Sequence, residues 1–334
     1  MRNIFKLKNA FTYGTIGVLL VVLIVVLILC FPEMTKQDSL TGDGSTVTQN
    51  GTEQDSSKED TDTEDSTDTE DATNVEDTTT ENDTESNKNT ETILGNGEFV
   101  NPEFAGLSNQ SEGWGPGGDR NELGQYMCCF SYNKKYRPYD AYFMVEDSNY
   151  IYLTMDEGYE NGYTPAILDT LKEKNVKIVF FVTSQFVKSN PELVQRMIDE
   201  GHTVGNHSTT HPSKGMPSLT IDAQKNDIMG LHNLIKDTYG YEMSLFRNPA
   251  GIFSEQSLAV TKSLGYKSVF WSFAYYDYDP ADQPEPTAAL NKMMDKLHPG
   301  AIYLLHAVSA TNTQVLGDFI DQARQAGYEF AVLK

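Results

Sequence analysis

The chain of 334 residues has few cysteines: only Cys30, Cys128 and Cys129 are present. Cys30 lies in an apolar run, and the other two are sequence neighbours, which rarely bridge each other. A disulfide framework and a zinc knuckle are therefore excluded. Basic residues are also scarce, because 25 Lys and Arg stand against 48 Asp and Glu. Nucleic acids repel such an acidic chain, so we expect no nucleic-acid partner.

A small-residue cleavage site is missing after the N-terminal apolar run. Residues 1–9 carry three basic side chains, and residues 10–31 are dominated by Val, Leu and Ile. About 20 apolar residues span a bilayer, and positive charge before the run keeps the N-terminus inside. A cleaved signal peptide is the alternative, but its apolar region is shorter, about 7 to 15 residues. We expect an uncleaved anchor in the cell membrane, with the rest of the chain outside the cytoplasm.

Apolar residues are nearly absent from the segment that follows. Residues 37–92 contain 18 acids and 2 lysines, and so carry 16 of the 23 net negative charges. A segment of Asp, Glu, Ser and Thr cannot bury enough surface to offset the entropy of ordering, which predicts disorder. We therefore divide the chain into a cytoplasmic N-terminus 1–9, a transmembrane anchor 10–31, a disordered tether 32–95, a packed lead-in segment 96–149 and a catalytic domain 150–334.

The last part of the chain alternates between apolar strands and amphipathic helices. The seven predicted strands are 150–155, 176–183, 202–207, 244–248, 268–273, 301–306 and 328–333. Helices capped by Thr164, Asn190 and Ser254 are predicted between them, with others at about 219–239, 287–297 and 312–326. Such alternation predicts a parallel sheet. No G-x-G-x-x-G follows the first strand, which argues against a dinucleotide fold and favours a closed (β/α) barrel.

Polar residues gather at the carboxyl ends of these strands, where barrel enzymes place their active sites. These residues are Asp156, Glu157, His207, His211, Arg247, Asp277 and His306. The spacing of the two histidines in HSTTH suits one metal ion, with a carboxylate from another strand completing the set. A metal-activated water, a carboxylate base and a histidine that protonates a leaving amine together make a hydrolytic site. These residues therefore predict metal-assisted hydrolysis of an amide or ester.

Four motifs in this order resemble the polysaccharide deacetylases with a NodB-type homology domain. They are TMDEG (154–158), HSTTH (207–211), RNPAG (247–251) and IYLLH (302–306), and the resemblance covers about Trp114 to Lys334. It implies a distorted (β/α)7 barrel. Other stretches, such as SVFWS and HPGAIYLLHAVS, are most similar to the bacterial de-N-acetylases that act on muramic acid on the way to the muramic δ-lactam of spore cortex.

The resemblance also implies roles for catalytic residues. Asp156 matches the base that activates water, and Arg247 matches the arginine that orients this base. Asp277 matches a motif acid expected to pair with that arginine, and His306 matches the general acid. The backbone N–H of Ala250 falls at the oxyanion position.

The implied metal ligands are His207, His211 and Glu157, the last standing where most relatives have an aspartate. The implied cofactor is a divalent metal, zinc first, with manganese, cobalt and magnesium as alternatives. Tyr278 is a candidate sugar-binding residue.

The resulting hypothesis is metal-dependent removal of the N-acetyl group from amino sugars of peptidoglycan, at N-acetylmuramic acid. The expected partners are peptidoglycan glycan strands and an amidase that removes stem peptides first. A peptidoglycan N-acetylglucosamine deacetylase and an inactive wall-binding module are the two alternatives.

Overall fold

The computed structural model describes residues 90–92 and 104–334. The predicted anchor and nearly all of the predicted tether lie outside the described residues, so they stay predictions. Within the described part of the chain, no helix has the length and apolar character needed to cross a membrane.

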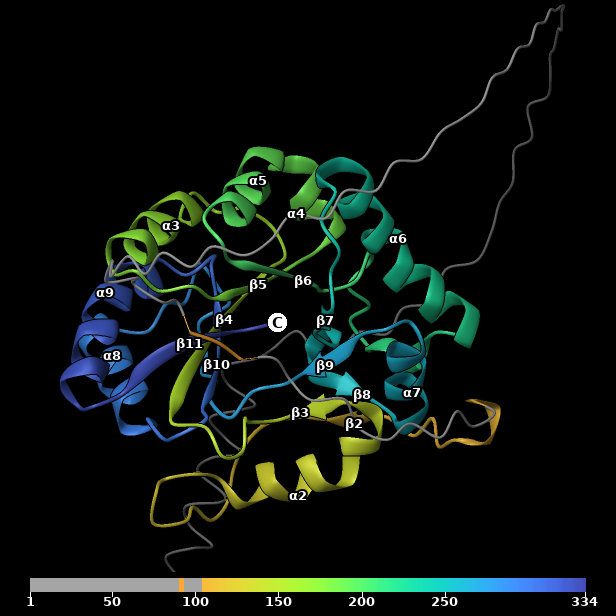
Figure 1. The fold of residues 1–334 in the computed structure, drawn as a ribbon, viewed down its shortest axis with the longest axis horizontal. Helices are drawn as coiled ribbons and strands as arrows, with labels where there is room; N and C mark the ends of the chain where they lie inside the picture. Colours follow the sequence, from red (N-terminus) through yellow and green to blue (C-terminus); the bar gives the residue numbers. More distant parts are fainter. Residues whose placement is uncertain (1–89, 93–103) are drawn as a thin grey trace, which may run out of the picture. The chain divides into compact units, whose positions relative to one another are not determined.

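A ring of parallel strands forms the centre of the described chain, and helices surround it (Figure 1). The strands that correspond to the seven predicted ones are β4 (Tyr150–Glu157), β5 (Val179–Val182), β6 (Thr203–Asn206), β7 (Leu245–Phe246), β9 (Lys267–Val269), β10 (Ile302–His306) and β11 (Glu329–Leu333). Neighbouring strands follow the order β11-β4-β5-β6-β7-β9, and β10 also pairs with β4. The predicted parallel α/β architecture is confirmed.

The ring is less regular than an ideal barrel. Strand β10 pairs with β4 along its whole length, from Ile302 opposite Tyr152 to His306 opposite Asp156. On its other side, β10 meets the chain after β9 through a single bridge between Tyr303 and Phe273. Main-chain hydrogen bonds from the Ser272 amide to the Ile302 carbonyl at 2.9 Å and from the Leu304 amide to the Phe273 carbonyl at 2.8 Å join the two segments at this bridge. This side of β10 is therefore paired over a shorter length than the side that faces β4.

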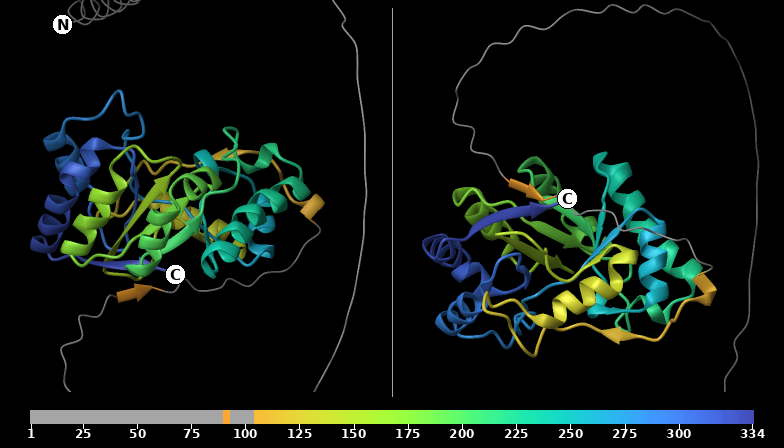
Figure 2. Two further views of the ribbon diagram at one scale, coloured as in Figure 1. Left: turned by 90° about the horizontal axis from the view of Figure 1, so that it is seen from above. Right: turned by 60° about the horizontal axis from the view of Figure 1, so that its bottom comes forward.

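The helices are α3 (Thr164–Glu173), α4 (Ser184–Ser189), α5 (Pro191–Asp199), α6 (Ile221–Tyr239), α7 (Glu255–Ser263), α8 (Pro286–Asp295) and α9 (Ala310–Gln325). Ser254 caps α7 with its side chain, and Gly240 ends α6 in the left-handed conformation, both as predicted. Asn190 precedes α5 but makes no side-chain cap. Thr164 is not a cap either. It is the first residue of α3, and its hydroxyl donates to Glu157. Figure 2 shows α8 and α9 at the opposite end of the ring from α6 and α7.

Alternate residues of each strand face two different apolar layers. In β4, Ile151, Leu153 and Met155 pack in the layer beneath the helices, whereas Tyr152 packs in the second layer, inside the ring. Strand β5 behaves in the same way, with Phe180 outside and Phe181 inside. Because successive side chains point to opposite faces, this alternation fixes the face on which every polar strand-end residue emerges.

The chain before β4 packs against the ring. Helix α2 (Met127–Tyr136) leads to β3 (Ala141–Tyr142), which pairs with β9, and β2 (Glu112–Gly113) pairs with β8 (Ile252–Phe253). Phe143 stacks on Phe270 with 4.3 Å between ring centroids. The indole N–H of Trp114 donates to the carbonyl of Trp271 at 2.8 Å. The segment before β4 therefore packs against β8, β9 and Trp271, which follows β9.

Gly300, just before β10, should be among the least replaceable residues. Its φ is +75°, and a Cβ there would lie 2.0 Å from the carbonyl oxygen of Val145. We expect Gly300→Ala to lower the free energy of unfolding by about 2–5 kcal/mol, through left-handed strain and a clash with backbone. Gly265 is the matched control: its φ is +85°, but nothing lies within 4 Å. Gly265→Ala should cost only about 1–2 kcal/mol. Denaturant unfolding measures both, and equal losses would contradict the clash.

Candidate active site

The strand ends meet at a cavity of about 700 Å³. The predicted residues that line it are Asp156, His207, His211, Ala250, Tyr278 and His306. Arg247 and Asp277 are fully buried behind this lining. Glu157 does not belong to the lining. The structure thus places six of the nine predicted residues at the cavity wall and two in contact with them.

Asp156 lies between a guanidinium and an imidazole. Its Oδ1 accepts from Arg247 Nη1 at 3.0 Å, and its Oδ2 is 3.4 Å from His207 Nε2. Burial alone would raise the pKa of Asp156, but the charge of Arg247 and its hydrogen bond outweigh burial and lower this pKa below its ordinary value of 3.8. The carboxylate is therefore ionised and faces the cavity, as a base must.

Arg247 is held from every side of its guanidinium. It donates to the carbonyl of Val269 at 3.1 Å, to Thr154 Oγ1 at 2.8 Å and to the carbonyl of Phe270 at 3.3 Å. The ring of Phe181 lies 4.2 Å from its Cζ. A buried charge needs such extensive pairing, and the four hydrogen bonds, with the one to Asp156 included, fix the orientation of the side chain. The sequence reading missed Thr154, although it lies on the same face of β4 as Asp156.

His207 is fixed as a neutral imidazole. Its Nδ1 lies 2.9 Å from the carbonyl oxygen of Arg247, which leaves Nε2 facing the Asp156 carboxylate. Burial lowers the pKa of His207 to about 4. A neutral ring with one nitrogen bound to backbone is the form in which histidine ligates metals.

The HSTTH loop brings the second histidine back toward the first. Ser208 and His211 both have positive φ, 71° and 47°, so the loop turns sharply at each. Asp227 of α6 holds the loop, because its backbone and side-chain oxygens accept from Thr209 and Thr210. The rings of His207 and His211 are 4.7 Å apart. This loop geometry places both imidazoles on one wall of the cavity.

The predicted role of Glu157 as a ligand finds no support in the geometry. Its carboxylate accepts from Thr164 Oγ1 at 3.2 Å and lies in the layer between β4 and α3. Burial, with repulsion from Glu160, raises the pKa of Glu157 well above its ordinary value of 4.5. The reason is strand alternation: Asp156 points into the ring, so Glu157 points outward.

The two imidazoles fit a divalent cation, whereas the full predicted set of three does not assemble. Among the described residues, no group of three or more His, Cys, Asp and Glu is arranged to hold a metal ion. His207 and His211 nevertheless share one wall, and His207 has the backbone partner that metal-binding histidines use. The chain therefore offers two nitrogen ligands, without the Glu157 oxygen.

His306 faces the cavity opposite the arginine, and its partner is Asp277. The distance between His306 Nδ1 and Asp277 Oδ1 is 2.7 Å, and Asp277 Oδ2 also accepts from the His306 amide at 2.9 Å. The expected pairing of Asp277 with Arg247 is wrong: the arginine, which follows β7, pairs with Asp156 of β4. Burial would lower the pKa of His306, but the hydrogen bond and charge of Asp277 outweigh burial and raise it above 6.5.

Ala250 and Tyr278 complete the wall. Ala250 adopts a left-handed conformation with φ 55°, an unusual strain for a residue with a Cβ, of the kind found at functional sites. Tyr278 is 55% exposed, and its ring centroid lies 5.7 Å from that of His306. The assignment of the Ala250 backbone N–H to the oxyanion and the assignment of Tyr278 to sugar binding stay predictions.

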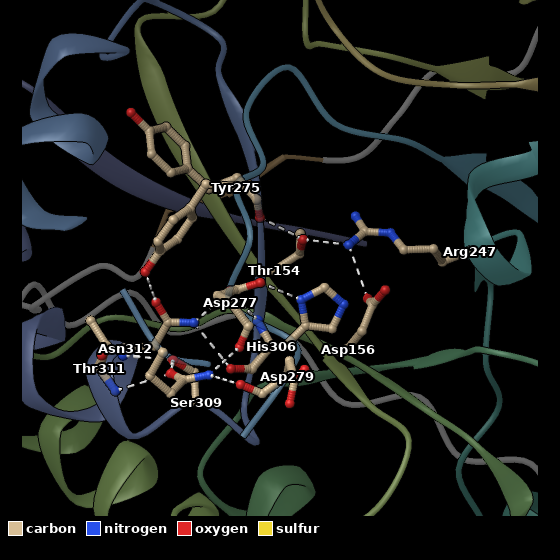
Figure 3. A network of polar contacts seen from close by, with 12 residues as sticks. Thr154, Asp156, Arg247, Tyr275, Asp277, Asp279, His306, Ser309, Thr311 and Asn312 are labelled. Carbon is tan, nitrogen blue, oxygen red and sulfur yellow. Dashed lines mark hydrogen bonds and ion pairs between the residues drawn. The ribbon is translucent and has the colours of Figure 1, made fainter. Parts of the chain in front are cut away.

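A buried amide was missed by the sequence reading. Asn312, in the first turn of α9, donates to Asp277 Oδ2 at 2.6 Å and accepts from the hydroxyl of Tyr275 (Figure 3). The only signal in the sequence is its place three residues after Ser309, which caps α9. That spacing alone did not distinguish it from other helix residues.

An ionised carboxylate, a protonatable histidine and the imidazoles of His207 and His211 around one cavity are the groups of a hydrolase. The chain belongs to the polysaccharide deacetylase family, whose model matches residues 145–269. Peptidoglycan-N-acetylmuramic acid deacetylase PdaA of Bacillus subtilis is 43% identical over 200 residues, 59% of this chain and 75% of that protein. Peptidoglycan-N-acetylglucosamine deacetylase PgdA of Listeria monocytogenes is 31% identical over 61% of this chain and 43% of that protein.

Solved structures agree with the family. The structure of Bacillus subtilis PdaA, described as a family 4 carbohydrate esterase, superposes with a TM-score of 0.63 at 39% identity. The match covers 68% of this chain and 96% of that one. The chain is thus an enzyme of the polysaccharide deacetylase class by family, fold and site.

The paired His306 and Asp277 predict an alkaline limit on activity. A general acid must carry its proton, so deacetylation should fall as pH rises through the raised pKa of His306. Asp277→Asn removes the charge that raises this pKa and leaves burial, which lowers it, so the alkaline limb should move to lower pH. Profiles of kcat/KM against pH measure the shift.

The control for this profile is Asp279→Asn in the same loop. Asp279 contacts Tyr276 and the Ala281 amide and does not contact His306. The alkaline limb of the pH profile of Asp279→Asn should keep the position found in the unaltered protein. An unmoved limb in Asp277→Asn would contradict the assignment of this limb to His306.

Proposed function

We propose that this protein hydrolyses the N-acetyl group of N-acetylmuramic acid in peptidoglycan. The observation that carries the proposal is the register of β10 on β4. This register sets His306 directly beside Asp156 at the rim of one cavity. The base and the acid therefore flank the same bond of a bound substrate. The family match and the similarity to PdaA support the choice of an N-acetyl amide.

The proposed reaction uses one proton transfer on each side of the amide. Asp156 withdraws a proton from the attacking water, whose oxygen bonds to the acetyl carbonyl carbon. The bond from that carbon to nitrogen then breaks, and His306 Nε2 gives its proton to the departing nitrogen. Acetate and a free sugar amine result. Arg247 keeps Asp156 ionised and aimed at the cavity throughout.

A divalent cation is part of the proposal. His207 and His211 would hold it, and zinc suits two imidazoles, with manganese, cobalt and magnesium as alternatives. When bound, such an ion supplies Lewis-acid activation of water and carbonyl. Because Glu157 faces α3, the protein provides fewer ligands than the sequence predicted.

The setting of the reaction is also proposed. The N-terminal run 10–31 anchors the chain as a single span, and residues 32–95 tether the catalytic domain outside the cytoplasm. The glycan strands of the wall are then in reach of the cavity. An amidase would first remove the stem peptides from the glycan strands. The deacetylated muramic acid would then be converted to the muramic δ-lactam of spore cortex.

Acetate release from purified peptidoglycan tests the reaction. The full protein should release acetate after metal addition, and chelation should abolish release. His207→Ala should lose both activity and stoichiometric metal binding, because it removes a ligand. His232→Ala is the control, since His232 contacts Tyr266 away from the cavity. Wall binding without acetate release in the presence of zinc, manganese, cobalt and magnesium would instead indicate an inactive module.

Mass spectrometry of muropeptides from a deletion strain tests the substrate. Loss of muramic δ-lactam is expected, because deacetylated muramic acid is its precursor. A gain of acetylated glucosamine with unchanged δ-lactam would favour the second candidate, which the similarity to Listeria PgdA suggests. Pretreatment of the substrate with an amidase should raise the rate if stem peptides must leave first.

A further inference from the structure

We propose that Asn312 is a positioning residue for the general acid, which locks the Asp277 carboxylate and the backbone of His306 in one arrangement. The inference rests on the proposed role of His306. It concerns a residue outside the four motifs and outside the cavity wall.

Every polar group of the Asn312 side chain is used. Nδ2 donates to Asp277 Oδ2 at 2.6 Å and to the His306 carbonyl at 3.1 Å, and Oδ1 accepts from the hydroxyl of Tyr275. The side chain is fully buried. Because the Asp277 carboxylate and the His306 carbonyl can only accept, they determine the orientation of the amide, and both N–H groups point to the acid side of the site.

The contact matters because it occupies the oxygen of Asp277 that does not face the imidazole. Asp277 Oδ1 takes the His306 ring, while Oδ2 takes the His306 amide and Asn312. A carboxylate bound at both oxygens cannot rotate about its own axis. The carboxylate then holds the His306 ring so that Nε2 faces the cavity. Figure 3 shows this ring between Asp277 and Asp156.

The helix that carries Asn312 is fastened to the loop that carries Asp277. Gln283 Nε2 donates to the carbonyl of Asp277 at 3.0 Å, and its Oε1 accepts from Ser309 Oγ at 2.5 Å. Thr311 Oγ1 donates to the Pro284 carbonyl at 2.7 Å. These bonds set the distance between α9 and the loop. At this distance Asn312 reaches the Asp277 carboxylate.

A purely structural role would have a different signature from a positioning role. Loss of general packing would impair every reaction at the cavity. Loss of acid positioning would impair only reactions whose leaving group needs a proton. An N-acetyl amide expels an amine and needs this proton, whereas p-nitrophenyl acetate expels a stable phenolate and does not.

The experiment compares these two substrates in the metal-loaded full chain. A general acid contributes about 10²–10⁴-fold, so we expect Asn312→Ala to lower kcat for N-acetyl glycan by about 10–100-fold. KM should stay unchanged, because Asn312 does not line the cavity. Turnover of p-nitrophenyl acetate should be retained, which also shows that the variant is folded. Asn312→Asp, of the same shape but with an oxygen facing Asp277, should give the same pattern.

Two further variants separate the possible outcomes. Thr313→Val is the matched control in the same helical turn, since its hydroxyl contacts only Ser309, and both activities should persist. His306→Gln should lose amide hydrolysis and keep ester hydrolysis. If His306→Gln retains amide hydrolysis, the proposed role of His306 fails. If His306→Gln loses it but Asn312→Ala and Asn312→Asp keep it, or lose both activities equally, the role of Asn312 is overturned.

Discussion

The buried ion pair between Arg247 and Asp156 is the constraint on which the rest of the site depends. A guanidinium with no exposed surface is costly unless its donors are bound. Here the acceptors are Thr154 and Asp156 of β4, the carbonyl of Val269 in β9 and the carbonyl of Phe270 just after it. The same arginine also gives its backbone carbonyl to His207. One residue therefore keeps the Asp156 carboxylate ionised and orients the imidazole beside it. The barrel must bring β4, β7 and β9 together for any of these contacts to form.

Much of the fold and part of the site could be predicted from the sequence, for local physical reasons. Strand β5 is a continuous apolar run, and α6 ends at a glycine and α7 begins at a capping serine, which act within a few residues. Carboxyl ends of parallel strands share one edge, so Asp156, His207 and His306 had to approach each other. Glu157 could have been assigned correctly from the two-residue period of a strand alone, because its neighbour already occupied the inner face.

What the sequence could not provide is the pairing of groups that lie far apart along the chain. Whether Asp277 meets Arg247 or His306 depends on the course of the loop after β9, and no periodicity reports that course. Thr154 and Asn312 are ordinary residues in their local contexts: one is a strand threonine and the other a helix asparagine. Their importance comes from partners 93 and 35 positions away, respectively. Such contacts are consequences of tertiary packing, which local propensity does not encode.

The unequal pairing on the two sides of β10 has a consequence for the spacing of the groups at the cavity. Asp156 and His306 sit opposite each other on two strands that are bonded along five consecutive positions, so their separation is stiff. The neighbouring wall, with Trp271 and Tyr278, follows β9 and joins β10 by one bridge. The separation of Asp156 and His306 thus depends on the longer of the two pairings of β10. A change in the wall that carries Trp271 and Tyr278 would therefore leave the spacing of the Asp156 carboxylate and the His306 imidazole in place.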